Sequence, residues 1–353
     1  MRTLPLRTLL LATFPLAASA AACSSGADPG SGPGGATSSS SAAATGGAGG
    51  TAATTSTSAT GGAGGAEVEP AGVFVAVGYG GRRIRSIDDG LTWINDASLM
   101  FNGGDDLFLL RTIAWGNGLF VAAGWRIMTS PDGVTWKDTP PDSFNQNWIG
   151  QIAHGGGSFV GLGGYGSRVA SADAVTWTQH SIDTIATHAE GGLVFAKGKV
   201  WVSVNDSGDL SHSADGVAWV YASTNLGAGT HAVAYGNGTF VAIGDGGAVT
   251  STDGLSWSSP TAFAGAASLK SLLFAQGHFT VLAPDHVYTS NDGVAWVDHE
   301  ANNLNVGAAV YGHGTYVALQ GNTVWRSNDS ITWTTTLYLG GPNSLSRIAF
   351  GPK

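Results

Sequence analysis

The segment Ala234–Trp257, AYGNGTFVAIGDGGAVTSTDGLSW, decides the fold because it contains four strand-like pieces separated by turn signals. Its first two apolar runs are joined by Asn237-Gly238, a dipeptide typical of two-residue hairpins because both residues tolerate positive φ. The pieces AVTS and LSW are joined by a second tight turn, Thr252-Asp253-Gly254. The segment therefore predicts a small antiparallel sheet of four strands.

The end of this segment, a serine, one residue, an aspartate and then a tryptophan, recurs seven times, and we call each copy a box. The boxes are Ser86–Trp93, Ser130–Trp136, Ser171–Trp177, Ser213–Trp219, Ser251–Trp257, Ser290–Trp296 and Ser327–Trp333. Their tryptophans lie 37 to 43 residues apart. A period near 40 residues is typical of one supersecondary unit repeated many times.

The second strand of each unit is apolar at nearly every position, as in FVAVG (Phe74–Gly78) and LFVAAG (Leu119–Gly124). A strand of this kind is covered on both faces. The sequence contains no amphipathic helical stretch that could cover it, so the neighbouring sheets must do so. The sequence thus predicts an all-β fold, a seven-bladed β-propeller of four-stranded antiparallel blades.

The first unit lacks its first strand, and a matching strand occurs near residue 350. SRIAFG (Ser346–Gly351) matches RTIAWG (Arg111–Gly116) position for position. We therefore expect this C-terminal strand to complete the first blade and close the ring, which removes the free sheet edges of an open array. The propeller is expected to span residues 71–353.

Each first strand carries one ring-bearing side chain near its end. The seven are Trp115, His154, Phe195, Tyr235, Phe274, Tyr311 and Phe350. We interpret them as packing residues between blades, because aromatic side chains bury large areas. The alternative is a set of ligand-stacking rings around the central channel.

The box resembles the Asp-box, or BNR repeat, of the sialidase-like propellers. The first copy fits the pattern S-x-D-x-G-x-T-W with Ser86, Asp88, Gly90, Thr92 and Trp93, and the other copies are one residue shorter. The wider unit is similar to the repeats of photosystem II assembly-factor propellers and of bacterial surface proteins. The resemblance implies either a ligand- or protein-binding and assembly module or, as the alternative, a sialidase-like or other glycan-cleaving hydrolase with a degraded signature.

The seven box aspartates are expected to be structural, since a short Asx side chain in a tight turn bonds nearby backbone N–H groups. They are Asp88, Asp132, Asp173, Asp215, Asp253, Asp292 and Asp329. The alternative is calcium, but calcium takes six to eight converging oxygens and each box supplies one carboxylate. No metal ion and no other cofactor is expected.

Residues 1–22 are expected to be an export signal, with Arg2 and Arg7 ahead of a short apolar core. The single cysteine, Cys23, resembles the lipidated cysteine of bacterial lipoproteins. Residues 23–70 are rich in Gly, Ser, Ala and Thr, a composition typical of a disordered linker. We expect a lipid-anchored monomer at the bacterial outer membrane or cell surface.

Composition excludes some activities. The formal net charge is −9 and no basic stripe occurs, so nucleic acid is not an expected partner. Sialidases use an arginine triad and a Tyr–Glu pair, but no Arg-Ile-Pro motif is present and the propeller holds two glutamates, Glu190 and Glu300. A carboxylate pair among the aspartates stays open, because pairing is spatial. No catalytic residue is singled out, and the sequence favours binding over catalysis.

One group of residues in the sequence suggests a ligand-binding site. Arg83, Arg126 and Arg168 begin the third strand of three consecutive units, with Trp125 and Tyr165 in the adjoining loops. Guanidinium and aromatic groups suit an anionic protein segment or glycan. The alternative is that the arginines pair with loop carboxylates such as Asp105 or Asp106.

Overall fold

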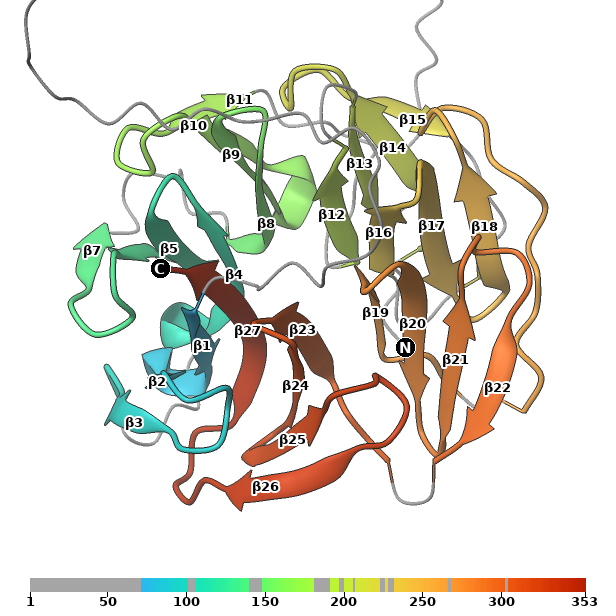
Figure 1. The fold of residues 1–353 in the computed structure, drawn as a ribbon. Coiled ribbons are helices and arrows are strands. Elements are labelled where there is room, and N and C mark those ends of the chain that lie inside the picture. The colour runs from blue at the N-terminus through green and yellow to red at the C-terminus, as the bar shows by residue number, and fades with distance from the viewer. Residues whose placement is uncertain are drawn as a thin grey trace, which may run out of the picture. The chain divides into compact units, whose positions relative to one another are not determined.

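The computed structural model describes residues 71–353 except 101–105, 140–147, 181–190, 197–199, 206, 223–225, 228–231, 266–267 and 302–303. The predictions for residues 1–70, including Cys23, lie outside the described residues. The described part forms seven antiparallel sheets arranged as the blades of a ring (Figure 1). The predicted seven-bladed propeller is therefore confirmed. Within the described residues, no helix is long and apolar enough to span a membrane.

Each blade is built outward from the central axis. The innermost strands are β27 (Leu345–Pro352), β4 (Leu110–Gly116), β8 (Ile149–Gly155), β12 (Gly192–Phe195), β16 (Ala232–Gly236), β19 (Ser271–Ala275) and β23 (Ala308–Gly312), for blades 1 to 7. The second strands are β1 (Gly72–Gly78), β5 (Leu119–Gly124), β9 (Ser158–Gly163), β13 (Trp201–Val204), β17 (Thr239–Gly244), β20 (His278–Ala283) and β24 (Thr315–Gln320).

The outer half of each blade contains the box. The third strands are β2 (Arg83–Ser86), β6 (Ile127–Ser130), β10 (Arg168–Ser171), β14 (Leu210–Ser213), β18 (Gly247–Ser251), β21 (His286–Ser290) and β25 (Thr323–Ser327). The outermost strands are β3 (Ile94–Ala97), β7 (Lys137–Thr139), β11 (Thr178–His180), β15 (Val220–Ala222), β22 (Val297–Glu300) and β26 (Thr334–Tyr338). Three short 3-10 helices complete the described structure: η1 (Tyr79–Gly81), η2 (Asp106–Phe108) and η4 (Gly164–Gly166).

Blade 5 has three regular strands, and its outer segment pairs with β18 at two separate points. The N–H of Ser258 donates to the Thr250 carbonyl, and Ala248 and Thr261 exchange two backbone hydrogen bonds. Pro260 lies between these points and has no N–H to donate, so a continuous ladder cannot form there.

The ring closes as predicted, because β27 pairs with β1 over its full length, from Gly72 opposite Pro352 to Gly78 opposite Leu345. A buried guanidinium joins blade 1 to blade 7. Arg82 donates to both carboxylate oxygens of Asp96, at 2.9 and 2.6 Å, and to the carbonyls of Gly340 and Asn343, at 2.9 and 2.7 Å. It also donates to Asn322 Oδ1 at 2.8 Å. We call this set of contacts the Arg82 clasp.

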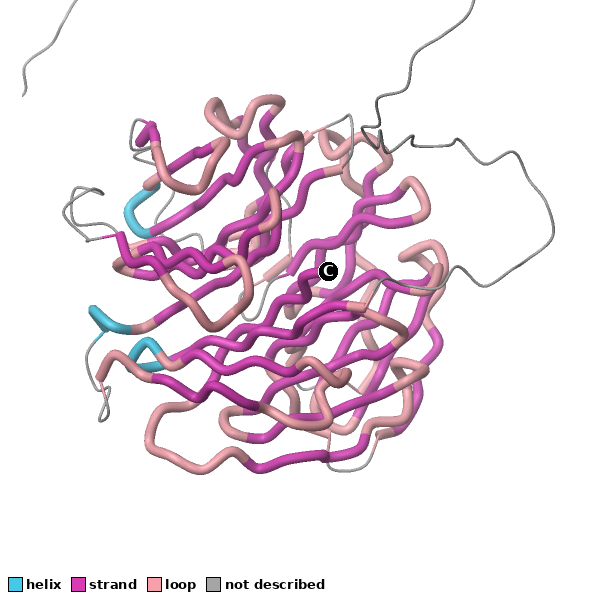
Figure 2. The backbone as a smooth tube through the Cα atoms, turned by 60° about the vertical axis from the view of Figure 1, so that its left-hand side comes forward, coloured by secondary structure: helices cyan, strands magenta, loops and turns pink. Residues whose placement is uncertain are grey.

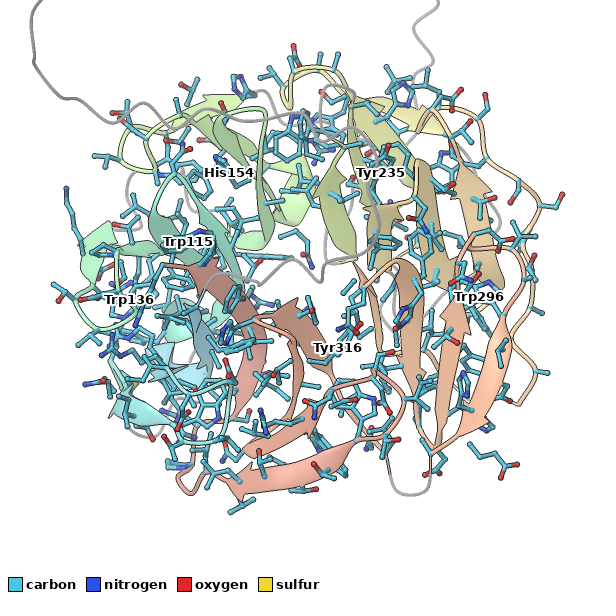
Figure 3. The ribbon with its side chains drawn as sticks, viewed as in Figure 1. Trp115, Trp136, His154, Tyr235, Trp296 and Tyr316 are labelled. Atoms are coloured by element: carbon cyan, nitrogen blue, oxygen red, sulfur yellow. The ribbon has the colours of Figure 1, made fainter. Side chains whose placement is uncertain are left out.

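The ring-bearing side chains of the innermost strands pack between blades, in agreement with the packing interpretation. The ring of His154 fills the space beside Gly116 of the preceding blade, where a Cβ would lie 2.0 Å from the imidazole. It also packs against Phe159 of its own blade, at 4.8 Å between ring centres. Burial lowers the pKa of His154, since a charged imidazolium loses its hydration there. In Figure 3 Trp115, His154 and Tyr235 lie nearer the centre of the ring than Trp136 and Trp296.

The box glycine is required by the preceding blade as well as by its backbone. Gly133 has φ 75°, and a Cβ on it would lie 2.6 Å from Val75. Two boxes have no glycine and keep the positive φ, Ala174 at 59° and Ser330 at 66°. Ser330 faces Thr280 where the other blades have valine, and the two hydroxyls are 3.0 Å apart. A hydrogen bond therefore replaces an apolar contact at this one interface.

Candidate functional site

The propeller has two unlike faces. In each blade, the hairpin between the first two strands and the box lie on the same side of the ring. A hydrogen bond shows this: Asn117 in a hairpin donates to the carbonyl of Ala172 in the next box, at 2.9 Å. We call this side the box face and the other side the loop face. The innermost strands begin on the loop face and end on the box face.

The loop face contains a hollow at the start of the innermost strands, which we call the mouth. It has a volume of about 410 Å³ and is bordered by the innermost strands of blades 1 and 3 to 7. A smaller hollow of about 190 Å³ adjoins it through Arg347 and is lined by Tyr79, Leu109, Arg111, Gly150 and Ser346. Concave sites with apolar walls and a few polar groups are the usual places for ligands.

The mouth is asymmetric because blades 1 to 3 carry β-bulges at their innermost strands. The register shifts by one residue at Arg111, at Gly150 and at Ser346. The described innermost pairings of blades 4 to 7 contain no such shift. Bulges re-aim side chains and are frequent beside functional sites. All three bulged residues line the smaller hollow, so the bulges shape this side of the mouth.

The two arginines that line the smaller hollow are oriented by their neighbours. The Arg111 guanidinium lies 4.5 Å from the centre of the Trp148 ring, which is nearly fully buried. Arg347 donates from Nη1 to the carbonyl of Ser346 at 2.9 Å. The hydroxyl of Ser346 bonds the Leu110 carbonyl at 3.2 Å and so joins blades 1 and 2. These contacts hold Arg111 and Arg347 in place at the edge of the smaller hollow.

The charged side chains in the described lining of the two hollows are basic, in a protein that is negative as a whole. The described residues that line the two hollows include Arg111, Lys270 and Arg347 and contain no aspartate or glutamate. The full sequence has 24 acidic and 15 basic residues. A concave surface of one sign attracts ligands of the opposite sign. Anionic groups are thus the chemistry that this site favours.

The structure brings together two of the three arginines singled out in the sequence. Arg126 forms an ion pair with Asp138 at 3.4 Å. The Asp138 carboxylate also attracts the charge of Arg83, but burial has the larger effect and lowers the pKa of Arg83. Arg168 lies apart, with its guanidinium 5.3 Å from the ring centre of Trp219 and a hydrogen bond to the Tyr221 hydroxyl at 3.0 Å.

Arg83 is 8% exposed and Arg168 is 3% exposed, so both are packed between blades. The indole N–H of Trp125 is buried without a hydrogen-bond partner, and the side chain of Tyr165 lies outside the described residues. Ligand binding by this group stays a prediction. The mouth is the better candidate because its cations line a hollow.

The box aspartates are held by their own turns. In the fifth box Asp253 accepts the N–H groups of Leu255 and Ser256, at 2.8 and 2.9 Å, and the hydroxyl of Ser251 at 2.9 Å. These bonds lower the pKa of Asp253 to about 2, because they stabilise the carboxylate. Among the described residues, no three His, Cys, Asp or Glu side chains converge where a metal ion could bind.

The pKa of all seven box aspartates is lowered, so we expect acid to destabilise the fold through them. A carboxylate with a folded pKa below its unfolded value contributes stability above about pH 4 and loses it as pH falls toward about 2. Urea midpoints should therefore fall between pH 4 and 2, and less steeply for Asp253→Asn, which cannot ionise. Asp245→Asn, in an exposed turn, is the control and should follow the wild type. Equal slopes for all three proteins would contradict this role.

A third hollow, of about 450 Å³, lies between the boxes of blades 6 and 7 and is lined by His278, Asp292 and Asp329 among others. Its two carboxylates accept hydrogen bonds from their own turns, and His278 lies 2.9 Å from the buried Ser330 hydroxyl. The two carboxylates and the imidazole therefore already form hydrogen bonds within the boxes or between the two blades. This hollow is therefore a weaker candidate than the mouth.

Sequence reasoning missed Arg111, Lys270 and Arg347 as site residues. A signal for the two arginines was present in the sequence. The matching strands RTIAWG and SRIAFG each carry an arginine near their start, at the first position in one and at the second in the other. The position of Lys270 beside Arg347 in the mouth had no local signal, because it depends on the ring bringing the innermost strands of blades 6 and 1 to one hollow.

No protein-family model matches the chain, and no curated protein matches it. Among solved structures, YCF48 bound to D1 peptide is 15% identical, with a TM-score of 0.56 over 71% of this chain and 89% of that one. A streptogramin B lyase is 10% identical, with a TM-score of 0.58 over 68% and 86%. The virginiamycin B lyase of Staphylococcus aureus is 7% identical, with a TM-score of 0.54 over 67% and 86%. These similarities show a shared β-propeller fold, which serves both peptide binding and enzymes in these proteins.

Proposed function

We propose that this protein is a binding module that captures an acidic segment of a partner protein at the mouth. The observation that carries the proposal is that two adjoining hollows are lined by cations, Lys270 and Arg347 in the mouth and Arg111 and Arg347 in the smaller hollow, beside three bulged strands. Arginine and tyrosine are among the residues enriched at binding hot spots, and Tyr79 lines the smaller hollow with Arg111 and Arg347. The peptide complex of YCF48 supports the use of this fold for binding a peptide.

The described lining contains no carboxylate, the group on which glycoside hydrolysis depends. The geometry therefore favours binding over the hydrolase alternative. It also favours a peptide over a large folded surface, because a hollow of about 410 Å³ accommodates a few side chains.

We further propose that Cys23 is lipidated and that residues 24–70 act as a tether. Ala71 and Lys353 are joined by a backbone hydrogen bond at the box face, so the chain enters the propeller on the side opposite the mouth. A tether entering there supports presentation of the mouth away from a membrane. Cys23→Ser should release the protein from the membrane fraction, and unchanged fractionation would contradict the anchor.

The binding proposal is tested with a peptide of four Glu-Glu-Ser repeats and, for comparison, four Lys-Lys-Ser repeats. The acidic peptide should bind the wild type, and its affinity should fall with rising salt. The double change Lys270→Gln/Arg347→Gln should weaken binding about tenfold, which corresponds to about 1.4 kcal/mol. The matched control, Lys137→Gln/Lys353→Gln, removes two exposed positive charges elsewhere and should bind as the wild type does.

Two results would contradict the proposal. One is the absence of binding of the acidic peptide at low salt, and the other is an equal loss in the mouth variant and the control. Thermal melting of both variants separates a loss of binding from a loss of folding, since a variant that melts near the wild type is folded.

A further inference from the structure

An exposed apolar patch lies beside the mouth on the loop face. Tyr79, Leu99, Met100 and Leu107 are 43%, 39%, 40% and 48% exposed. We call these four residues the shoulder. They come from three segments, namely η1, the segment after β3, and η2. In Figure 2 the short helices, in cyan, all lie on one side of the propeller, and two of them are neighbours.

The segments of the shoulder are in contact. The N–H groups of Leu99 and Met100 both donate to the Gly80 carbonyl, at 2.9 and 3.0 Å. The Leu99 side chain lies directly over Gly81, where an added Cβ would come within 2.8 Å of it. Helices η1 and η2 contact each other, which brings Leu107 to the same side.

The shoulder differs from the other exposed apolar side chains of the propeller. In four of the seven boxes a single aliphatic side chain is exposed, as Val175 and Val294 are, at 53% and 55%. Single exposed residues of this kind are ordinary on soluble proteins. Several together beside a charged hollow indicate an interaction site.

The shoulder is also held in place before any partner arrives. Asn343 donates to the Met100 carbonyl at 2.7 Å, and the Arg82 clasp holds Asp96 in β3, just before the segment that carries Leu99 and Met100. A binding surface that is already ordered loses less entropy on binding. The shoulder continues into the smaller hollow, because Tyr79 lines it together with Arg111 and Arg347.

We infer that the shoulder is an apolar docking subsite for the same partner segment, so that this segment combines acidic residues with aliphatic side chains. The inference rests on the proposed function, since the acidic residues are the ones that the mouth attracts. Charge complementarity selects this occupant: the cations beside the shoulder favour an acidic amphipathic peptide over a basic one.

The test compares two peptides of equal charge, four Glu-Glu-Leu repeats and four Glu-Glu-Ser repeats. The leucine peptide should bind the wild type about tenfold more tightly than the serine peptide. Met100→Ser/Leu107→Ser should abolish this difference and leave binding of the serine peptide unchanged. The matched control, Val175→Ser/Val294→Ser on the box face, should keep the difference.

Equal binding of both peptides by the wild type would overturn the shoulder and leave the proposed function standing. The same holds if the difference survives in the shoulder variant or disappears in the control. If only the leucine peptide binds, and the shoulder variant abolishes that binding, the shoulder stands and the acidic mouth fails. Leu99→Ser provides a second shoulder variant, and thermal melting shows whether each variant folds.

Discussion

Deletion of residues 346–353 should abolish cooperative folding of the propeller at 37 °C. The deletion removes nearly all of β27, which pairs with β1 from Gly72 to Gly78 and contributes Ile348 and Ala349 to the interblade core. It also leaves β1 as an unpaired edge, with its backbone groups exposed to other chains. The loss is on the order of the whole stability of a domain, about 5–15 kcal/mol.

Thermal unfolding followed by circular dichroism checks this result. Deletion of residues 24–66 is the control, since it removes more residues but none of the described strands, and it should leave the melting temperature unchanged. A synthetic peptide of residues 343–353 should restore a cooperative transition to the truncated protein. Equal melting temperatures for the two truncations would refute closure by β27.

Replacement of Arg82 by methionine should destabilise the propeller by roughly 3–5 kcal/mol, because several acceptors lose their donor at once. Arg82 is 3% exposed, and three of its acceptors lie outside blade 1: Asn322 between β24 and β25 of blade 7, and Gly340 and Asn343 in the closing segment between β26 and β27. The melting temperature should fall by roughly 10 °C for a domain of this size.

Asp96→Asn is the informative comparison for the Arg82 clasp. Asp96 is about half exposed, so water screens its charge and replaces its hydrogen bonds. The Asp96→Asn change should therefore lower the free energy of unfolding by about 1 kcal/mol or less. Similar losses for Arg82→Met and Asp96→Asn would mean that the ion pair, and not the bonds to the closing segment, stabilises the clasp.

The sequence by itself determined the blade. The strand lengths, the hairpin at Asn237-Gly238 and the glycine in Thr252-Asp253-Gly254 are local properties, because tight turns restrict φ and buried strands need apolar residues. Seven copies at a near-constant period then require a ring of seven sheets, and the match between SRIAFG and RTIAWG identifies the strand that closes it.

The sequence also predicted a ligand site on blades 1 to 3, but two of the three arginines on which that prediction rested are buried. Arg83 and Arg168 begin third strands, and the alignment gave no sign that each would lie against the box tryptophan of the next blade. That contact depends on the rotation between blades, which no single repeat encodes.

Tertiary structure alone decided the mouth, the shoulder and the Arg82 clasp. Lys270 and Arg347 are 77 residues apart in the sequence and line one hollow because the ring brings the innermost strands together around an axis. Leu99 joins the shoulder through the Gly80 carbonyl, and Arg82 reaches Asn343 across the closure of the ring. Periodic local patterns specify a repeating unit, whereas its functional surface arises where non-repeating residues of different blades converge, and that convergence is a property of the closed ring.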